Sequence, residues 1–298
     1  MRSNWKRELP LHAMLLPAVV LLFLFHYVPM LGNVMAFQHF IPAKGFFRSE
    51  WVGFDNFRYL ILLPDTLQAL LNTVYIAFMK IVAGLVVPIA VALLLNEVRA
   101  GLLKRGIQTL IYLPHFLSWI ILGGILIDML SPSTGIVGQL LQGLGVKPIF
   151  FLGDNDWFPF TLVVSNEWKE FGFGTIVYLA ALAGINPMLY EAALIDGAGR
   201  WKQTIHVTLP SMLPIIVLMS TLSMGQILNA GFEQVFTLYS PQVYESGDIL
   251  DTFVYRLGVV DAQYSVATAV GLFKSLVSFV FVSLSYGLAY RFAGYRIF

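Results

Sequence analysis

Two long apolar segments flank the polar stretch EAALIDGAGRWKQTIHVTLP, which occupies residues 191–210. The stretch carries Glu191, Asp196, Arg200 and Lys202 among small residues, whereas apolar residues dominate on both sides. A chain whose apolar segments lie in lipid has to place such charges in water or against a partner. The loop therefore indicates a membrane protein with a surface that a soluble partner can reach.

The composition points to the same class of protein. Of the 298 residues, 58% are hydrophobic and only 12% are charged, with a net charge of +1. Soluble domains carry roughly 25% charged residues, and a near-zero net charge gives no reason to expect a nucleic-acid partner. The chain has no cysteine, which excludes disulfides, thiolate metal sites and cysteine nucleophiles. We expect an all-α integral membrane protein with a single transmembrane domain over residues 1–298 and a core over about 67–292.

Six segments are long and apolar enough to cross a bilayer, which takes about 20 residues per helix. Before the first segment stand Arg2, Lys6 and Arg7, and no small-residue cleavage site follows it, so we expect an uncleaved helix. The six expected spans lie near 11–38, 71–97, 105–130, 158–184, 210–236 and 267–292.

The basic residues beside these spans predict the orientation, because cytoplasmic flanks carry an excess of Lys and Arg. Alternate flanks hold two sets of such residues, and the set that includes the N-terminus is the larger. We therefore expect both termini and the loop over about 186–210 to lie in the cytoplasm. The larger set is Arg2, Lys6, Arg7, Arg99, Lys104, Arg105, Arg200, Lys202, Arg291 and Arg296; the smaller is Lys44, Arg48, Arg58, Lys147 and Arg256.

Local patterns inside the loop predict two short helices joined at a glycine. Asn186 can cap the first helix, Pro187 is favoured at its first position, and the helix should then run over 188–196. Gly197 should break it, because glycine adopts backbone angles that a side chain would forbid. A second helix is expected over about 199–207, with Pro210 ending it and opening the fifth span. The alternative is an ordinary amphipathic connecting helix.

The loop resembles, nearly position for position, the EAA loop of permeases in ATP-binding-cassette importers. The stretch YLAALAGI at 178–185 and the following Tyr190 also resemble the carbohydrate branch of that family, including permeases of alginate-type importers of complex oligosaccharides. The stretch WVGFDNF at 51–57 is similar to a segment after the first span of sugar permeases, or is an interfacial aromatic anchor. The residues that match the EAA loop are Glu191, Ala192, Ala193, Asp196, Gly197, Ala198, Leu209 and Pro210.

This resemblance implies a type I importer permease fold with about six transmembrane helices and a cytoplasmic coupling helix. In the family, the coupling helix sits in a cleft of a separate ATPase subunit and transmits its motion to the spans. The implied partners are a second homologous permease, two ATPase subunits, an extracytoplasmic solute-binding protein, an oligosaccharide and membrane lipid, in the bacterial cytoplasmic membrane. ATP and Mg would belong to the ATPase, so we expect no cofactor, metal or catalytic residue on this chain.

Polar residues inside the expected spans are candidates for a solute pathway, because charges there usually face a cavity or a partner charge. Asn166, Lys169 and Glu170 should share one helix face, while Gln226, Asn229 and Glu233 are spaced i, i+3 and i+7 on another. The alternative is internal pairing: Lys169 with Glu167 or Glu170, and Lys80 or Lys274 with Glu233. Three intramembrane lysines would favour an acidic oligosaccharide, but three glutamates balance their charge. The sequence therefore leaves the charge of the sugar open.

The rival function is an ion-gradient-driven secondary transporter with Glu170 or Glu233 as a proton relay. Such carriers usually show internal repeats with paired broken helices, which we do not find in the sequence. An enzyme is a third class, but the sequence has no GxxxxGK[ST] or HExxH motif and its five histidines are scattered. An ATP-driven importer permease is the interpretation that the loop favours.

Overall fold

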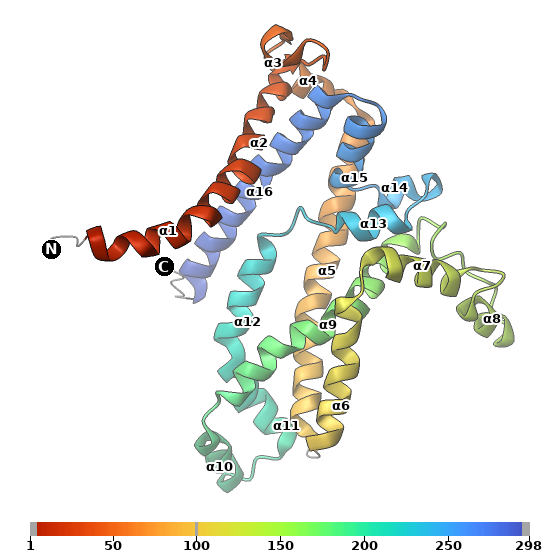
Figure 1. The fold of residues 1–298 in the computed structure, drawn as a ribbon. Coiled ribbons are helices and arrows are strands. Elements are labelled where there is room, and N and C mark those ends of the chain that lie inside the picture. The colour runs from red at the N-terminus through yellow and green to blue at the C-terminus, as the bar shows by residue number, and fades with distance from the viewer. Residues whose placement is uncertain (1–4, 99–100, 294–298) are drawn as a thin grey trace. The chain divides into compact units, whose positions relative to one another are not determined.

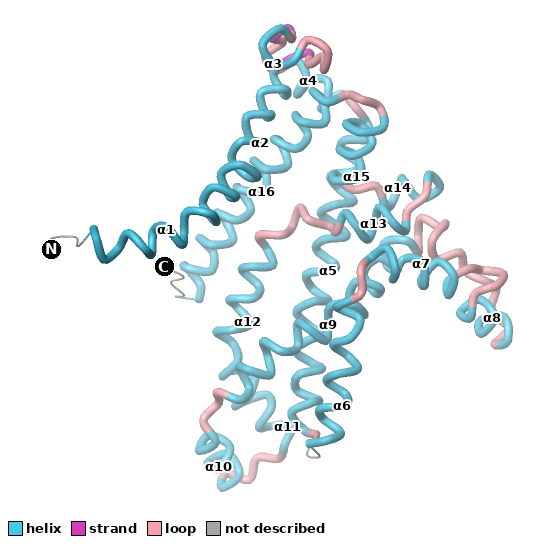
Figure 2. The backbone as a smooth tube through the Cα atoms, viewed as in Figure 1, coloured by secondary structure: helices cyan, strands magenta, loops and turns pink. Residues whose placement is uncertain are grey.

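A computed structural model describes residues 5–98 and 101–293, and its secondary structure is almost entirely helical (Figures 1 and 2). The chain forms two compact units, Met1–Leu63 with Val254–Phe273 and Pro64–Phe253 with Lys274–Phe298. Arg2, Arg99 and Arg296, which contribute to the predicted orientation, lie outside the described residues. The single domain over 1–298 stays a prediction.

The first unit contains one long apolar helix and a small aromatic cluster. The helix consists of α1 (Trp5–Leu22), a π turn at 23–27, α2 (Val28–Met30) and a 3-10 turn at 31–37. Its stretch Leu9–Phe37 is apolar enough to cross a membrane. Strand β1 (Gln38–His39) then pairs antiparallel with β2 (Glu50–Trp51), and α3 (Gly45–Arg48) and α4 (Asp55–Leu62) flank the pair. The Phe37 ring stacks on Trp51 with centroids 5.8 Å apart, so the stretch 51–57 packs onto the end of the helix.

The second unit is built on α5 (Pro64–Glu97) and α9 (Phe158–Ala183), which pack along each other (Figure 1). Helices α10 and α11 lie near the lower end of α5 in this view, and α7, α13 and α14 lie toward its other end. The other helices are α6 (Gly101–Tyr112), α7 (Trp119–Leu130), α8 (Ile136–Gly143), α10 (Pro187–Ile195), α11 (Arg200–Gln203), α12 (Leu209–Met224), α13 (Phe232–Leu238), α14 (Tyr244–Gly247), α15 (Leu250–Tyr255) and α16 (Tyr264–Ala293), of which the last two cross the unit boundary.

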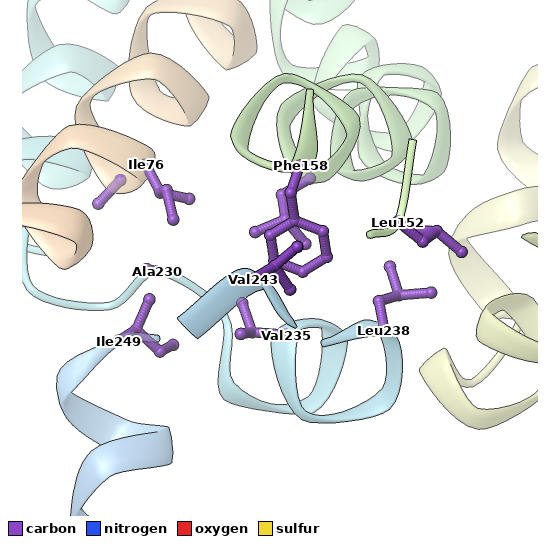
Figure 3. Packing of buried hydrophobic residues seen from close by; sticks show 10 residues of the cluster. Ile76, Leu152, Phe158, Ala230, Val235, Leu238, Val243 and Ile249 are labelled. Carbon is purple, nitrogen blue, oxygen red and sulfur yellow. The ribbon is translucent and has the colours of Figure 1, made fainter. Parts of the chain in front are cut away.

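A buried apolar cluster joins the segments at the α13 end of α5 (Figure 3). Ile76 of α5 and Phe158 of α9 lie in it with Val235 and Leu238 of α13, and all four are almost completely buried. Burying apolar side chains of this size stabilises a fold by about 1.5–3 kcal/mol each in water. The cluster packs α13 against α5 and α9, and within lipid such a contact is stabilised by close side-chain packing.

The helices α6 and α9 make a closer contact, backbone against backbone, at Gly172. A Cβ atom on Gly172 would lie only 1.9 Å from the carbonyl oxygen of Ile111 in α6. Two turns of helix can approach this closely only where one of them lacks a side chain. Gly172 therefore sets the position of the end of α6 against α9.

Four described helices are long and apolar enough to cross a membrane, and the number is six if each of two bent pairs counts as one span. This agrees with the expected all-α fold of about six spans. Of the predicted spans, 11–38, 71–97, 158–184 and 267–292 correspond to the helices Leu9–Phe37, Pro64–Glu97, Phe158–Ala183 and Tyr264–Ala293.

The third and fifth predicted spans are wrong as continuous helices. In the third, Gly101–Phe116 and Trp119–Leu130 meet at 101°, because Pro114 lacks an amide donor and the Ser118 hydroxyl caps the new helix by accepting from the Ile121 amide. In the fifth, α12 ends at Met224 rather than running to 236. Gly231, with φ of +91°, starts α13 as a separate helix.

The contact at Gly172 gives a stability prediction. Gly172→Ala should lower the free energy of unfolding by about 1–3 kcal/mol, the usual cost of overpacking, because the methyl group meets a backbone that cannot move aside. Thermal unfolding of the purified chain, followed by size-exclusion chromatography after heating, would measure the loss.

The matched control is Gly106→Ala in α6, whose added methyl would meet no atom of the described residues within 4 Å. This substitution should be neutral or stabilising by up to about 1 kcal/mol, because alanine is the better helix former. Equal stability of the two variants would contradict the close packing.

Candidate functional site

The predicted two-helix loop is present, and its turn has a defined hydrogen-bond pattern. The Asn186 side chain caps α10 by accepting from the Met188 amide at 3.0 Å. At the other end Gly197 has φ of +72°, its amide donates to the Leu194 carbonyl, and the Ala198 amide donates to the Ala193 carbonyl. These two bonds form a Schellman motif, which needs a left-handed residue at the position of Gly197. The predicted glycine break is thus confirmed.

The first half of the loop exposes both charge and apolar surface. Glu191, Ala192, Asp196 and Gly197 are exposed, while Ala193 and Ala198 are half-buried. Beside them Ile195 has 87% of its surface exposed, and Leu194 is exposed as well. Large apolar side chains that protrude from a polar loop mark a surface for another protein.

Contacts at the base of the loop join it to the end of α5. The Arg200 guanidinium donates to the Glu97 carboxylate at 2.6 Å, and the Tyr190 hydroxyl lies 3.0 Å from that of Thr208. A groove of about 600 Å³ opens here, lined by Leu93, Tyr190 and Trp201 among others. The loop is therefore held by its ends, and its tip stays open.

The second half of the loop differs from the prediction. Pro210 does not end a helix, because one continuous helix runs over Arg200–Met224, with a π turn at Thr204–Thr208. A proline removes one hydrogen bond to the preceding turn, and the wider π turn just before Pro210 lets the chain continue without that bond. Leu209 is half-buried and Pro210 exposed, so these two matched residues lie on the fifth span and not in the turn.

Among the candidate pathway residues, Lys169 and Glu170 of α9 form one pair that also contacts the bend after α6. The Lys169 ammonium donates to Glu170 Oε1 at 2.8 Å and to the His115 carbonyl at 2.8 Å. The other carboxylate oxygen of Glu170 lies 2.7 Å from His115 Nδ1, and the His115 ring stacks on Phe173. Internal pairing, which the sequence left as an alternative, is thus what Lys169 and Glu170 do in this structure.

Gln226, Asn229 and Glu233 do not share a helix face, and this part of the prediction is wrong. Gln226 and Asn229 lie in the break between α12 and α13, where the Asn229 amide donates to Gln226 Oε1 at 3.2 Å, and both are exposed. Glu233 is exposed in the first turn of α13. The half-buried Asn166 remains on α9 one turn from Lys169.

The predicted pairing of Lys80 or Lys274 with Glu233 is also wrong. Lys274 binds Asp251 at 2.5 Å, and Lys80 donates to the Ala230 carbonyl and to Gln234 Oε1. Gln234 in turn donates to the Leu162 carbonyl and to the Ser165 hydroxyl of α9, both at 2.8 Å. Sequence reasoning missed Gln234 because it read 210–236 as one helix, on which Gln234 lies on a different face from Gln226, Asn229 and Glu233.

No group of three His, Asp or Glu side chains that could hold a metal ion occurs within residues 5–98 and 101–293. The polar side chains described above bind one another and backbone carbonyls, at the bend of the third span and at the break in the fifth. The unit thus presents a loop with an exposed apolar tip and, separately, a broken span with exposed amide side chains.

A family model described as the binding-protein-dependent transport system inner membrane component matches residues 80–293. The chain belongs to this family. It is therefore a multi-pass inner-membrane permease, and the family resemblance predicted from the loop is confirmed. The matched segment begins at Lys80 and contains both bent spans and the loop.

Individual members of the family are similar over nearly the whole chain. Protein LplB of Bacillus subtilis (strain 168) is 42% identical over 93% of this chain and 87% of its own length. The polygalacturonan/rhamnogalacturonan transport system permease protein YteP of the same organism is also 42% identical, over 95% of this chain and 88% of its own.

Solved structures of a bacterial transporter that imports the acidic polysaccharide alginate match as well. One chain has a TM-score of 0.90 at 40% identity and covers 97% of this permease and 98% of that chain. A second, from a complex with an alginate pentasaccharide-bound periplasmic protein, has a TM-score of 0.89 at 39% identity over 97% and 96%. The type I importer permease fold is thus established for this chain.

The contacts of Lys169 give a prediction for the bend of the third span. Lys169→Met should lower the free energy of unfolding by about 1.5–3 kcal/mol, because it removes charged hydrogen bonds to Glu170 and to the His115 carbonyl. Loss of monomeric permease on heating in detergent would measure the change.

The control for this variant is Arg58→Gln, which removes a surface ion pair with Asp55 in which both side chains are more than half exposed. Exposed ion pairs contribute little to stability, so this variant should unfold like the unchanged chain. A Lys169→Met permease that unfolds at the same temperature as Arg58→Gln would show that the bend does not depend on Lys169.

Proposed function

We propose that this chain is the permease subunit of an ATP-driven, binding-protein-dependent importer of oligosaccharides. The observation that carries the proposal is the exposed two-helix loop over 186–210 on a chain that matches an alginate importer permease over 97% of its length. Its capped first helix, glycine turn and exposed apolar tip suit a surface that docks into another protein. The name of YteP, a transport system permease protein, and the transporter that imports alginate support an importer as the assembly.

The partner of the loop in this proposal is a separate ATPase subunit, which carries ATP and Mg. Glu191, Ala192, Ala193, Asp196, Gly197 and Ala198 form the docking surface, with Leu209 and Pro210 at the start of the span that the loop would move. A second, homologous permease completes the pathway, and a second ATPase docks on its loop. Both termini of this chain then lie in the cytoplasm, in agreement with the basic flanks.

The solute is proposed to be an oligosaccharide delivered by an extracytoplasmic binding protein. The support is that one similar structure contains an alginate pentasaccharide-bound periplasmic protein. An acidic sugar is favoured by the alginate transporter and not by the intramembrane lysines, because Lys80, Lys169 and Lys274 all have partners within this chain. Gln226, Asn229 and Glu233, whose side chains are exposed at the break in the fifth span, remain candidate solute contacts together with Asn166.

Purification of the tagged chain from its native membrane in mild detergent tests the whole proposal. An ATPase and a second permease should elute with it, and ATP hydrolysis should rise when the binding protein and oligouronates of defined length are added. A neutral oligosaccharide of equal length is the control for the acidic class. A chain that elutes alone, and whose transport collapses with the ion gradient, would establish the secondary transporter instead.

Substitutions in the loop test the coupling step. Gly197→Pro forces φ from +72° to a negative value and removes the amide that donates to Leu194, so transport should fall at least tenfold while the spans remain inserted. Glu191→Lys should have the same direction, because it reverses the charge of the exposed docking surface. The readout is the ratio of sugar transported to ATP hydrolysed in reconstituted vesicles.

The control for the loop variants is Gly199→Ala, since Gly199 has a negative φ of −68° and no atom of the described residues lies within 4 Å of the added methyl. It should transport normally. Normal transport by Gly197→Pro as well would exclude the loop as the coupling element.

A further inference from the structure

Lys80 of α5 lies at the break in the fifth span. Its ammonium donates to the Ala230 carbonyl at 2.6 Å and to Gln234 Oε1, and its Nζ would lie 3.1 Å from a Cβ atom on Gly231. Ala230 and Gly231 belong to the non-helical stretch between α12 and α13, where the Gly231 carbonyl accepts from the Val235 amide and the Ala230 carbonyl accepts from Lys80. In an apolar environment each such carbonyl needs a donor, and Lys80 supplies one.

The contact continues through Gln234 into α9. Gln234 is completely buried, and its side-chain amide donates to the Leu162 carbonyl and the Ser165 hydroxyl. One lysine and one glutamine therefore tie three segments together: α5, the break in the fifth span, and α9. Removal of the ammonium would leave the Ala230 carbonyl and Gln234 Oε1 buried without a charged donor.

A second acceptor for Lys80 lies close by on α9. Glu167 is only 8% exposed, and its Oε2 has no hydrogen-bond partner among the described residues. Its Oε1 would lie 3.3 Å from a Cβ atom on Gly84, which is one helical turn from Lys80 on the same face of α5. A buried carboxylate with a free oxygen is costly unless it gains a cation.

We propose that Lys80 is a positioning residue that exchanges partners during transport. In the present conformation it holds the break at Ala230 and Gln234; when the break shifts, the ammonium moves to Glu167 and releases the segment over 225–231. The exchange keeps the ammonium paired in both states, so neither state buries an isolated cation. This proposal deepens the proposed function, because the released segment carries the exposed Gln226 and Asn229.

A single cysteine can report on the break, since the chain has none of its own. Ala230 is completely buried, so Ala230→Cys is a small change whose thiol should react slowly with N-ethylmaleimide in the purified permease. Adding Lys80→Met should raise the labelling rate at least tenfold, because the break loses its donor. Lys80→Arg, which keeps a charged donor, should restore slow labelling to within a few-fold.

The matched control is Lys274→Met, which also removes a paired intramembrane lysine, but one whose ion-pair partner is Asp251 of α15 and not a group of the break. It should leave the labelling of Ala230→Cys unchanged. Equal labelling rates in the Lys80→Met and Lys274→Met backgrounds would overturn the holding role of Lys80. If Lys80→Met does not give a monodisperse permease, the Glu167 variant below decides the proposal alone.

Glu167→Gln tests the exchange in the complete importer. It removes the second acceptor, so labelling without ATP should stay slow, and the rise in labelling during ATP turnover should be lost with at least a tenfold fall in transport. Asp251→Asn is the control, and it should keep the turnover-dependent rise. A Glu167→Gln importer that labels and transports normally would overturn the exchange.

The outcomes separate this inference from the proposed function. Labelling of the purified permease without ATP requires neither an ATPase nor a sugar, so it tests the Lys80 contact even if the chain is no ATP-driven importer. Failure of ATP-driven transport in every background, the unchanged chain included, would reject the proposed function, and the turnover-dependent exchange with it.

Discussion

The need to satisfy backbone carbonyls where helices break inside an apolar environment controls this structure. Water cannot reach such carbonyls in a membrane, so a side chain has to supply the donor. Each of the two breaks contains a carbonyl that accepts from a lysine of a neighbouring continuous helix: the His115 carbonyl from Lys169 and the Ala230 carbonyl from Lys80. The charges inside the spans are therefore part of the fold, whatever else they do.

The helix α9 connects these breaks to the loop. Lys169 and Gly172 of α9 hold the bend of the third span, and Leu162 and Ser165 bind Gln234 beside the other break. At its far end α9 turns by 69° into α10. A single helix thus contacts every irregular segment of the second unit that has a candidate function.

The sequence predicts the loop better than the spans, and the physical reason is local. Asn186, Pro187 and Gly197 specify a cap, a first turn and a left-handed residue by their own chemistry, and each appears where it was expected. The third and fifth spans failed because hydropathy measures only whether residues tolerate lipid. Pro114 and Gly231 lie at breaks in segments that are apolar enough on average to pass as single spans. Whether a donor such as Lys80 is near enough to permit the break depends on tertiary contacts. The same limit hid Gln234, whose partners lie on two other helices.

The continuous helix from Arg200 to Met224 makes the two sides of the loop mechanically unequal. On this side the helical backbone is unbroken for 25 residues, about 38 Å along its path, and it includes a π turn at Thr204–Thr208 and Pro214. On the other side, α10 meets α9 at an angle, across Gly184 and Pro187. A displacement of the loop would therefore reach the fifth span through an unbroken helix, which can bend at its π turn and at Pro214, and would reach the fourth span across a corner. The two spans beside the loop would thus respond differently to the same displacement.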